Sequence, residues 1–147
     1  MVNYDIDIPK GCAHHAVHLE DTPVADLLDA LEDTLEFIEK AIDEHGGKVL
    51  VHCHNGMSRS AAVVLAHMCY SMGLSIDEAL DVLRMDCPSV APNEGFLQQL
   101  RLFVDMGCAS KPEQGLDSPN PLMGAASTTT IAAHQCWCNS LAPINQH

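Results

Sequence analysis

The feature that most constrains the fold is a short apolar strand that runs into a polar loop and then into an apolar helix. Residues 48–52 (KVLVH) are β-branched and apolar at their centre, which is typical of a fully buried parallel strand. Small and polar residues occupy positions 53–58. From Ser60 to Met72 the chain is apolar on nearly every side, which indicates a helix in the centre of the core. This order of elements favours an α/β fold.

Further strands and helices are indicated on both sides of this segment. Apolar residues recur at helical spacing from Leu27 to Ile42, after a Thr-Pro pair that is typical of a helix start. A Ser-x-x-Glu capping box and a later asparagine indicate two more helix starts. The expected elements are strands at 4–8 and 16–19 and helices at 23–45, 76–85 and 94–106. We therefore predict an α/β fold with a central, mostly parallel sheet flanked by helices.

The charge of the chain limits its partners. The formal net charge is −13, and 12 of the 20 acidic residues lie between Asp5 and Glu44. A field of this sign repels nucleic acids and anionic membranes, so we expect neither as a partner. It also repels phosphorylated molecules at long range, so a phosphate site would have to be built from local donors. Most of these acidic residues are otherwise expected to form a solvated helix face.

The cysteines indicate a reducing compartment. The 7 cysteines are odd in number and scattered, which argues against a disulfide framework. The first residues do not resemble a secretory signal, and no apolar run is long enough to cross a bilayer. We therefore expect free thiols and a location in the cytosol or the nucleus.

The composition changes after Gly107. Residues 1–109 are predicted to form one domain, whereas residues 110–147 are rich in Pro, Gly, Ser and Thr and are predicted to be a disordered tail. His134, Cys136 and Cys138 in the tail lack the separated ligand pairs of a structural zinc site. No metal and no other cofactor is expected.

The loop between the buried strand and the central helix carries the candidate chemistry. Backbone N–H groups of a tight turn through Gly56, together with the N-terminus of the next helix, can bind an anion. Cys53 lies at the base of this turn, where these donors and Arg59 favour the thiolate, the nucleophilic form. Arg59 can hold two phosphate oxygens, and Ser60 can donate to the sulfur. The residues expected to bind substrate are His54, Asn55, Gly56, Met57, Ser58 and Arg59.

These residues resemble a known family. Residues 49–60 read VLVHCHNGMSRS, which resembles the signature of cysteine-dependent protein phosphatases. The form HCxxGxSRS is similar to the dual-specificity branch, and residues 92–100 (PNEGFLQQL) are similar to it as well. The strongest resemblance is to the atypical subgroup that carries a C-terminal zinc-binding domain. It implies a protein phosphatase that hydrolyses phosphotyrosine and phosphoserine/threonine through a phosphocysteine intermediate, with Cys53, Arg59 and Ser60 as catalytic residues.

The resemblance also implies supporting residues. The family uses an upstream aspartate as general acid, and Asp21 in LEDTPVADL matches that loop. Glu20 is a competing proton donor, and Asp21 also suits a helix start, where the helix dipole favours a carboxylate. His52 is expected to lie behind the loop and orient it, and it equally fits a histidine in the core. Asn93 matches a position that braces the phosphate loop, or it only caps the last helix.

The sequence departs from the family pattern in two places. Family catalytic domains have a strand, a helix and a further strand ahead of the position of Tyr4, so we expect an N-terminally truncated domain. The tail lacks the zinc-ligand pattern of the subgroup. An inactive domain that binds phosphopeptides or a partner without turnover is therefore an alternative. The loop contains no lysine for the extra phosphates of inositol lipids, which favours a phosphoprotein as ligand.

Overall fold

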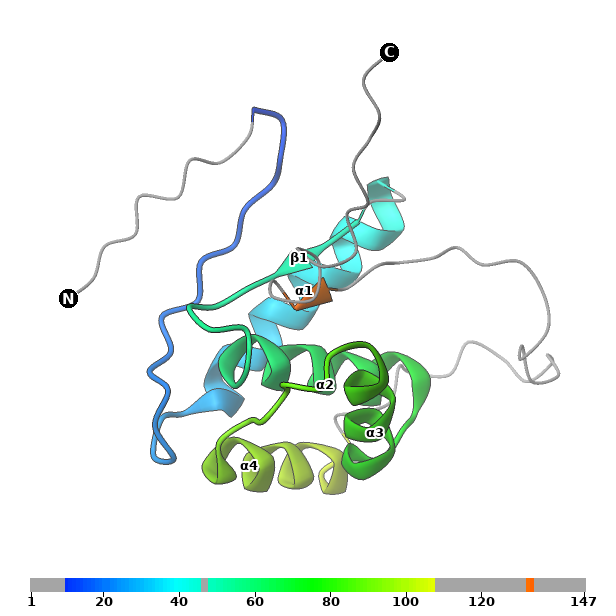
Figure 1. Cartoon of the computed structure of the whole chain (residues 1–147). Coiled ribbons are helices and arrows are strands. Elements are labelled where there is room, and N and C mark those ends of the chain that lie inside the picture. The colour runs from blue at the N-terminus through cyan, green and yellow to red at the C-terminus, as the bar shows by residue number, and fades with distance from the viewer. Residues whose placement is uncertain (1–9, 46–47, 108–131, 134–147) are drawn as a thin grey trace, which may run out of the picture.

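The described part of the chain consists mainly of helices packed around one central helix. The structure is a computed structural model that describes residues 10–45, 48–107 and 132–133 (Figure 1). Its elements are, in chain order, α1 (Leu27–His45), β1 (Leu50–Val51), α2 (Arg59–Met72), α3 (Ile76–Asp86), α4 (Glu94–Asp105) and β2 (Ala132–Ala133). No helix within the described ranges is long and apolar enough to span a membrane.

The described residues contain one small parallel sheet. Leu50 and Val51 of β1 pair with Ala132 and Ala133 of β2. The expected strand at 48–52 is therefore present over two residues, and its neighbour Val49 is buried, with 9% of its surface exposed. The larger parallel sheet expected from the sequence is not seen in this part of the chain, which is mostly helical.

Two other strands were expected from the sequence, at residues 4–8 and 16–19. Residues 4–8 lie outside the described residues. The strand expected at 16–19 is wrong, because this segment adopts no regular structure and runs along the surface (Figure 1). Val17 is exposed, so the apolar alternation there does not reflect burial of one face. A strand also needs a neighbouring strand for its backbone hydrogen bonds, and no described strand pairs with this segment.

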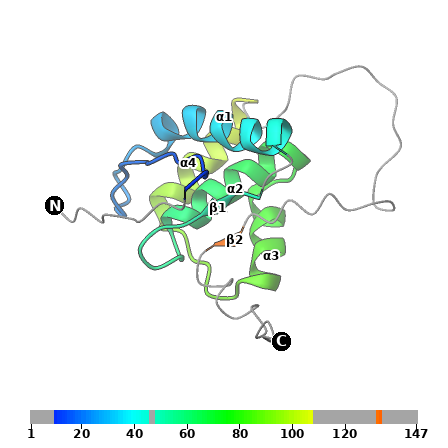
Figure 2. The ribbon, with the colours of Figure 1, turned by 90° about the horizontal axis from the view of Figure 1, so that it is seen from above.

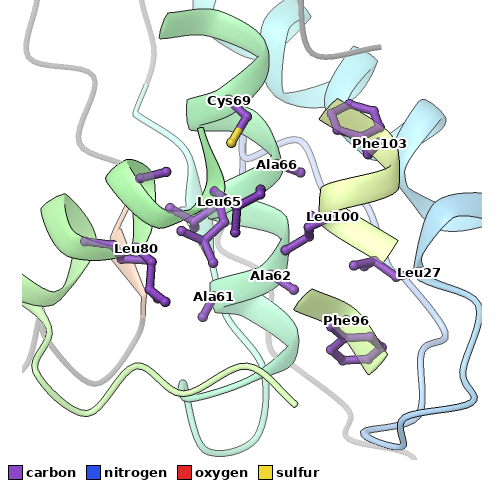
Figure 3. Close-up of a cluster of buried hydrophobic side chains, with 14 of the residues drawn as sticks. Leu27, Ala61, Ala62, Leu65, Ala66, Cys69, Leu80, Phe96, Leu100 and Phe103 are labelled. Atoms are coloured by element: carbon purple, nitrogen blue, oxygen red, sulfur yellow. The ribbon is translucent and has the colours of Figure 1, made fainter. Parts of the chain in front are cut away.

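Helix α2 forms the centre of the hydrophobic core, as its sequence predicts. Its buried side chains face α1, α3 and α4, and Figure 3 shows its small alanines between Leu80 of α3 and Leu100 of α4. Small residues let the neighbouring helices approach closely, while the large side chains of those helices fill the remaining space. The core residues that Figure 3 labels are Leu27, Ala61, Ala62, Leu65, Ala66, Cys69, Leu80, Phe96, Leu100 and Phe103.

The helix ends follow local capping rules, with one exception. Ser75 and Glu78 form the predicted capping box of α3, and Asn93 caps α4 by accepting a hydrogen bond from the Phe96 N–H. Helix α1, however, begins at Leu27 rather than at 23. Residues 22–25 form a turn closed by the Ala25 N–H and the Thr22 carbonyl at 3.2 Å. The carboxylate of Asp26 then accepts from the N–H of Asp29 and takes the capping role that was predicted for Thr22.

The cysteines only partly match the expectation of free thiols. Cys12, Cys53 and Cys69 are free. Cys87, which is buried at the end of α3, is disulfide-bonded. The predicted tail, residues 110–147, also lies outside the described residues except for Ala132 and Ala133. The predicted boundary near residue 109 stays a prediction.

Candidate active site

The loop from Cys53 to Ser58 turns tightly between β1 and α2. Gly56 is buried and has φ of 70°, in the left-handed region that other residues rarely adopt. This conformation directs the N–H of Gly56 at the sulfur of Cys53, at 3.2 Å. The turn is also fixed from outside, because the N–H of Ala91 donates to the carbonyl of Met57 at 3.0 Å.

The sulfur of Cys53 is surrounded by hydrogen-bond donors. The hydroxyl oxygen of Ser60 lies 3.2 Å from it, and Ser60 itself is buried. Partial burial of Cys53 raises its pKa, but hydrogen bonds from the Ser60 side chain and from the backbone N–H groups of Ser60, Gly56 and Asn55 outweigh burial. The net result is a pKa below the usual range of a thiol. The site therefore favours a thiolate, which is the nucleophilic form of cysteine.

Arg59 is the first residue of α2 and adjoins the donors around the sulfur. Its Nε atom is buried and, among the described residues, has no hydrogen-bond partner. The nearest acid is Asp21, whose Oδ2 lies 3.8 Å from this Nε, which is an ion pair rather than a hydrogen bond. A buried donor without an acceptor is costly unless an anion binds it. Arg59 is thus suited to binding a phosphate oxygen.

Ser58 connects the loop to Asp21. It occupies the N-cap position of α2, yet its side chain makes no capping hydrogen bond. Its hydroxyl instead donates to Oδ1 of Asp21 at 2.6 Å and accepts from the N–H of Asn93 at 3.0 Å. Ser58, which the sequence predicts to bind substrate, thus also links three segments of the chain.

Asp21 lies beside the loop at residues 53–58. Its Oδ1 accepts from Ser58 and from Nδ2 of Asn93, the latter at 2.9 Å. Glu20, the competing proton donor, is exposed and makes no hydrogen bond or ion pair to the described part of the loop. Of the two candidates, Asp21 is the one that is hydrogen-bonded to this loop. The side chain of Asn93 caps α4 and donates to Asp21, and its backbone N–H donates to Ser58 of the loop.

The remaining predicted residues lie around this centre. The side chains of His54, Asn55 and Met57 are exposed at the rim of the loop. His52 is exposed as well, so it is not a core histidine, and its orienting role stays a prediction.

Two residues of α4, Gly95 and Gln99, were not recognised as part of the site. Both contact the segment that carries Asp21. The sequence contained one signal: Gln99 occupies the apolar face of α4 that Phe96, Leu100 and Phe103 define, where a polar side chain is unexpected.

The comparisons with known proteins agree with this geometry. The family model described as "Dual specificity phosphatase, catalytic domain" matches residues 2–106. Mouse "Dual specificity protein phosphatase 12" is 46% identical over 87 residues, which are 59% of this chain and 25% of that protein.

Solved structures show the same fold class. The Yvh1 phosphatase domain from Chaetomium thermophilum has a TM-score of 0.61 at 29% identity, over 65% of this chain and 67% of that one. A mouse putative dual specificity phosphatase complexed with zinc tungstate has a TM-score of 0.56 at 37% identity, over 65% of this chain and 61% of that one. Both neighbours are α/β phosphatase domains, which confirms the predicted fold class at this level.

The extent of these matches is also informative. The chain spans 42% or less of the length of the first four curated relatives that it matches. The family model nevertheless covers well over half of the chain, including every residue placed in the site above. The chain therefore belongs to the dual specificity phosphatase catalytic domain family.

Proposed function

We propose that this chain is a protein phosphatase that hydrolyses phosphotyrosine and phosphoserine/threonine through a phosphocysteine intermediate. One observation carries the proposal: the sulfur of Cys53 receives hydrogen bonds from Ser60 and Gly56 at 3.2 Å. Asp21 is held next to the same loop by Ser58 and Asn93. A stabilised thiolate and a nearby carboxyl group are the two groups that such a reaction needs.

In the first step the Cys53 thiolate attacks phosphorus. The bond between phosphorus and the ester oxygen breaks as the bond between sulfur and phosphorus forms. Protonated Asp21 gives its proton to the departing tyrosine, serine or threonine oxygen. Backbone N–H groups of the loop and Arg59 stabilise the charge on the equatorial phosphate oxygens.

In the second step water releases phosphate from the enzyme. Asp21, now a carboxylate, accepts a proton from the attacking water. The bond between the water oxygen and phosphorus forms as the bond between sulfur and phosphorus breaks, and Cys53 leaves as a thiolate. The Ser60 hydroxyl lies close enough to donate a hydrogen bond to the leaving sulfur and stabilise its negative charge. Since Ser58 and Asn93 already donate to Oδ1 of Asp21, we assign proton transfer to Oδ2.

The substrate class follows from the rim of the loop. The exposed side chains there are His54, Asn55 and Met57, and none of them carries a fixed positive charge. A monophosphorylated protein side chain suits this rim better than a multiply phosphorylated lipid. The acidic chain also disfavours nucleic acid and anionic membrane as partners. We place the protein in the cytosol or nucleus, which imaging of the tagged chain would test.

The finer architecture is proposed on the same basis. We propose that β1 is one strand of a larger parallel sheet, because Val49 beside it is buried against Ile38 and Val63. Residues 1–109 would then be the phosphatase-like part and residues 110–147 a tail. Limited proteolysis that removes only the tail supports this division, and cleavage first inside 48–107 contradicts it.

Hydrolysis of an aryl phosphate by the purified chain tests the function. We expect turnover that Cys53→Ser abolishes and that Arg59→Lys reduces strongly, because lysine lacks the planar fork that binds two oxygens. Cys12→Ser is the matched control, since Cys12 is free and exposed. Equal activity in wild type and Cys53→Ser would refute the mechanism. Saturable phosphopeptide binding without release of phosphate would point to the binding module instead.

A further inference from the structure

Few apolar side chains hold the segment that carries Asp21, residues 10–26, against the core. Within residues 10–26 no residue is buried, and Leu19 and Ala25 are the partly buried apolar residues that pack against the core. A general acid must nevertheless be held within hydrogen-bond reach of the leaving oxygen. Other contacts therefore have to position this segment.

Gln99 of α4 supplies three such contacts. Its Oε1 accepts from the N–H of Leu27 at 2.7 Å and from the N–H of Leu28 at 3.3 Å. Its Nε2 donates to the carbonyl of Ala25 at 2.8 Å. The first N–H groups of a helix have no partner within the helix, so one side chain satisfies two of them at the start of α1. Gln99 thereby joins the end of the Asp21 segment to α4.

Gly95 supplies a close backbone contact on the same side of α4. It is buried, and a Cβ atom built there would lie 1.9 Å from the carbonyl oxygen of Pro23. The backbone of Pro23 thus lies directly on the first turn of α4. Figure 1 shows the segment before α1 turning beside the N-terminal end of α4.

Helix α4 and its N-cap residue therefore contact both the segment that carries Asp21 and the loop that carries Cys53. Asn93, Gly95 and Gln99 hold Asp21, Pro23 and Ala25 in matching order along the helix. The N–H of Asn93 also binds Ser58 of the phosphate loop. We propose that Gln99 and Gly95 are positioning residues that place the general acid relative to Cys53 without contacting the substrate.

This proposal rests on the proposed function, because it gives Asp21 the role of acid. Displacement of a reacting group by about 1 Å can cost about 10²-fold in rate. The loss should fall on proton transfer to the leaving group and spare attack by Cys53, since neither Gln99 nor Gly95 bonds to the phosphate loop. Phenyl phosphate, whose leaving group needs a proton, depends on the acid. p-Nitrophenyl phosphate, whose leaving group departs as an anion, depends on it much less.

The ratio of kcat/KM for these two substrates tests the proposal. In the 147-residue chain, Gln99→Leu should lower the phenyl phosphate value about 10- to 10²-fold relative to the p-nitrophenyl phosphate value. Partial unfolding would lower both values equally and leave the ratio unchanged. Gln98→Leu is the matched control, since Gln98 is exposed and makes no hydrogen bond or ion pair to the described residues. Gln99→Glu keeps an oxygen that accepts from the N–H groups of Leu27 and Leu28, so the ratio should fall less than in Gln99→Leu.

Two further measurements separate the possible failures. Asp21→Asn should change the same ratio; if it does not, the acid assignment of the proposed function is wrong. If Asp21→Asn changes the ratio and Gln99→Leu does not, the positioning role alone is overturned. Hydrogen exchange needs no activity: Gln99→Leu and Gly95→Ala should speed amide exchange in residues 20–28 relative to Gln98→Leu. Unchanged exchange there would overturn the proposal even if the chain shows no turnover.

Discussion

Replacing Ser60 with alanine removes one donor from the sulfur of Cys53 and leaves the backbone donors in place. Ser60 is 2% exposed, and its hydroxyl lies 3.2 Å from the sulfur. This hydroxyl lowers the pKa of Cys53, so its loss should move that pKa upward, toward the range of an ordinary thiol. A smaller fraction of Cys53 is then present as thiolate at the acidic end of the pH range in which the enzyme is active.

The size of the effect follows from the strength of a charged hydrogen bond. Such a bond contributes about 1.5–3 kcal/mol, and the half-buried sulfur of Cys53 suggests the lower part of that range. A loss of about 1.5–2 kcal/mol corresponds to about 10- to 30-fold in rate. It should act mainly on hydrolysis of the phosphoenzyme, the step in which the full thiolate is expelled.

Pre-steady-state kinetics provide the assay. Ser60→Ala should show a rapid burst of released alcohol or phenol followed by slow turnover, because phosphoenzyme forms faster than it is hydrolysed. The rate of Cys53 alkylation by iodoacetate, measured against pH, should shift to higher pH. Ser71→Ala, on the exposed side of the same helix, should change neither result. An unchanged alkylation profile in Ser60→Ala would refute the role assigned to this hydrogen bond.

Three further outcomes are expected. Asp21→Asn should lower kcat/KM for phenyl phosphate by about 10²- to 10⁴-fold and remove the alkaline limb of the pH–rate profile, and a retained limb would assign the acid elsewhere. Burial and the charge of Glu78 raise the pKa of Cys69 to about 11, so iodoacetamide at neutral pH should label Cys53 and spare Cys69 in the folded protein; labelling of both would contradict this. Phe96→Ala should lower the free energy of unfolding in urea by about 3–5 kcal/mol, because Phe96 is fully buried, whereas a loss below 1 kcal/mol would place it outside the core.

The parts of the site that depend on neighbouring residues could be predicted from the sequence. The turn at Gly56 and the helix start at Arg59 follow from the local pattern, as does the cap at Asn93. These features are fixed by contacts over a few residues, so composition and spacing are sufficient to recognise them. Resemblance to a family supplied the role of Asp21 as acid, whereas local rules indicate only a carboxylate at a helix start.

The parts that depend on distant residues could not be predicted. Ser58 bonds to Asp21 across 37 positions, and Gln99 bonds to Ala25 across 74. Such pairs are set by how α4 packs beside the segment before α1, which spacing along the chain does not encode. The start of α1 was predicted at residue 23 and lies at Leu27 for the same reason, since Gln99 of another helix accepts a hydrogen bond from the N–H group of Leu27. The strand prediction at 16–19 is wrong because no described strand pairs with this segment.

Direct capture of the phosphorylated enzyme tests the central claim, that Cys53 is the nucleophile. The 147-residue chain would be mixed with aryl phosphate, denatured in acid within milliseconds and digested for mass spectrometry, with Ser60→Ala used to enrich the intermediate. The mechanism predicts one phosphoryl group on the peptide that contains Cys53, absent from Cys53→Ser. Phosphate found on another residue, or turnover with no labelled peptide at any time, would contradict it.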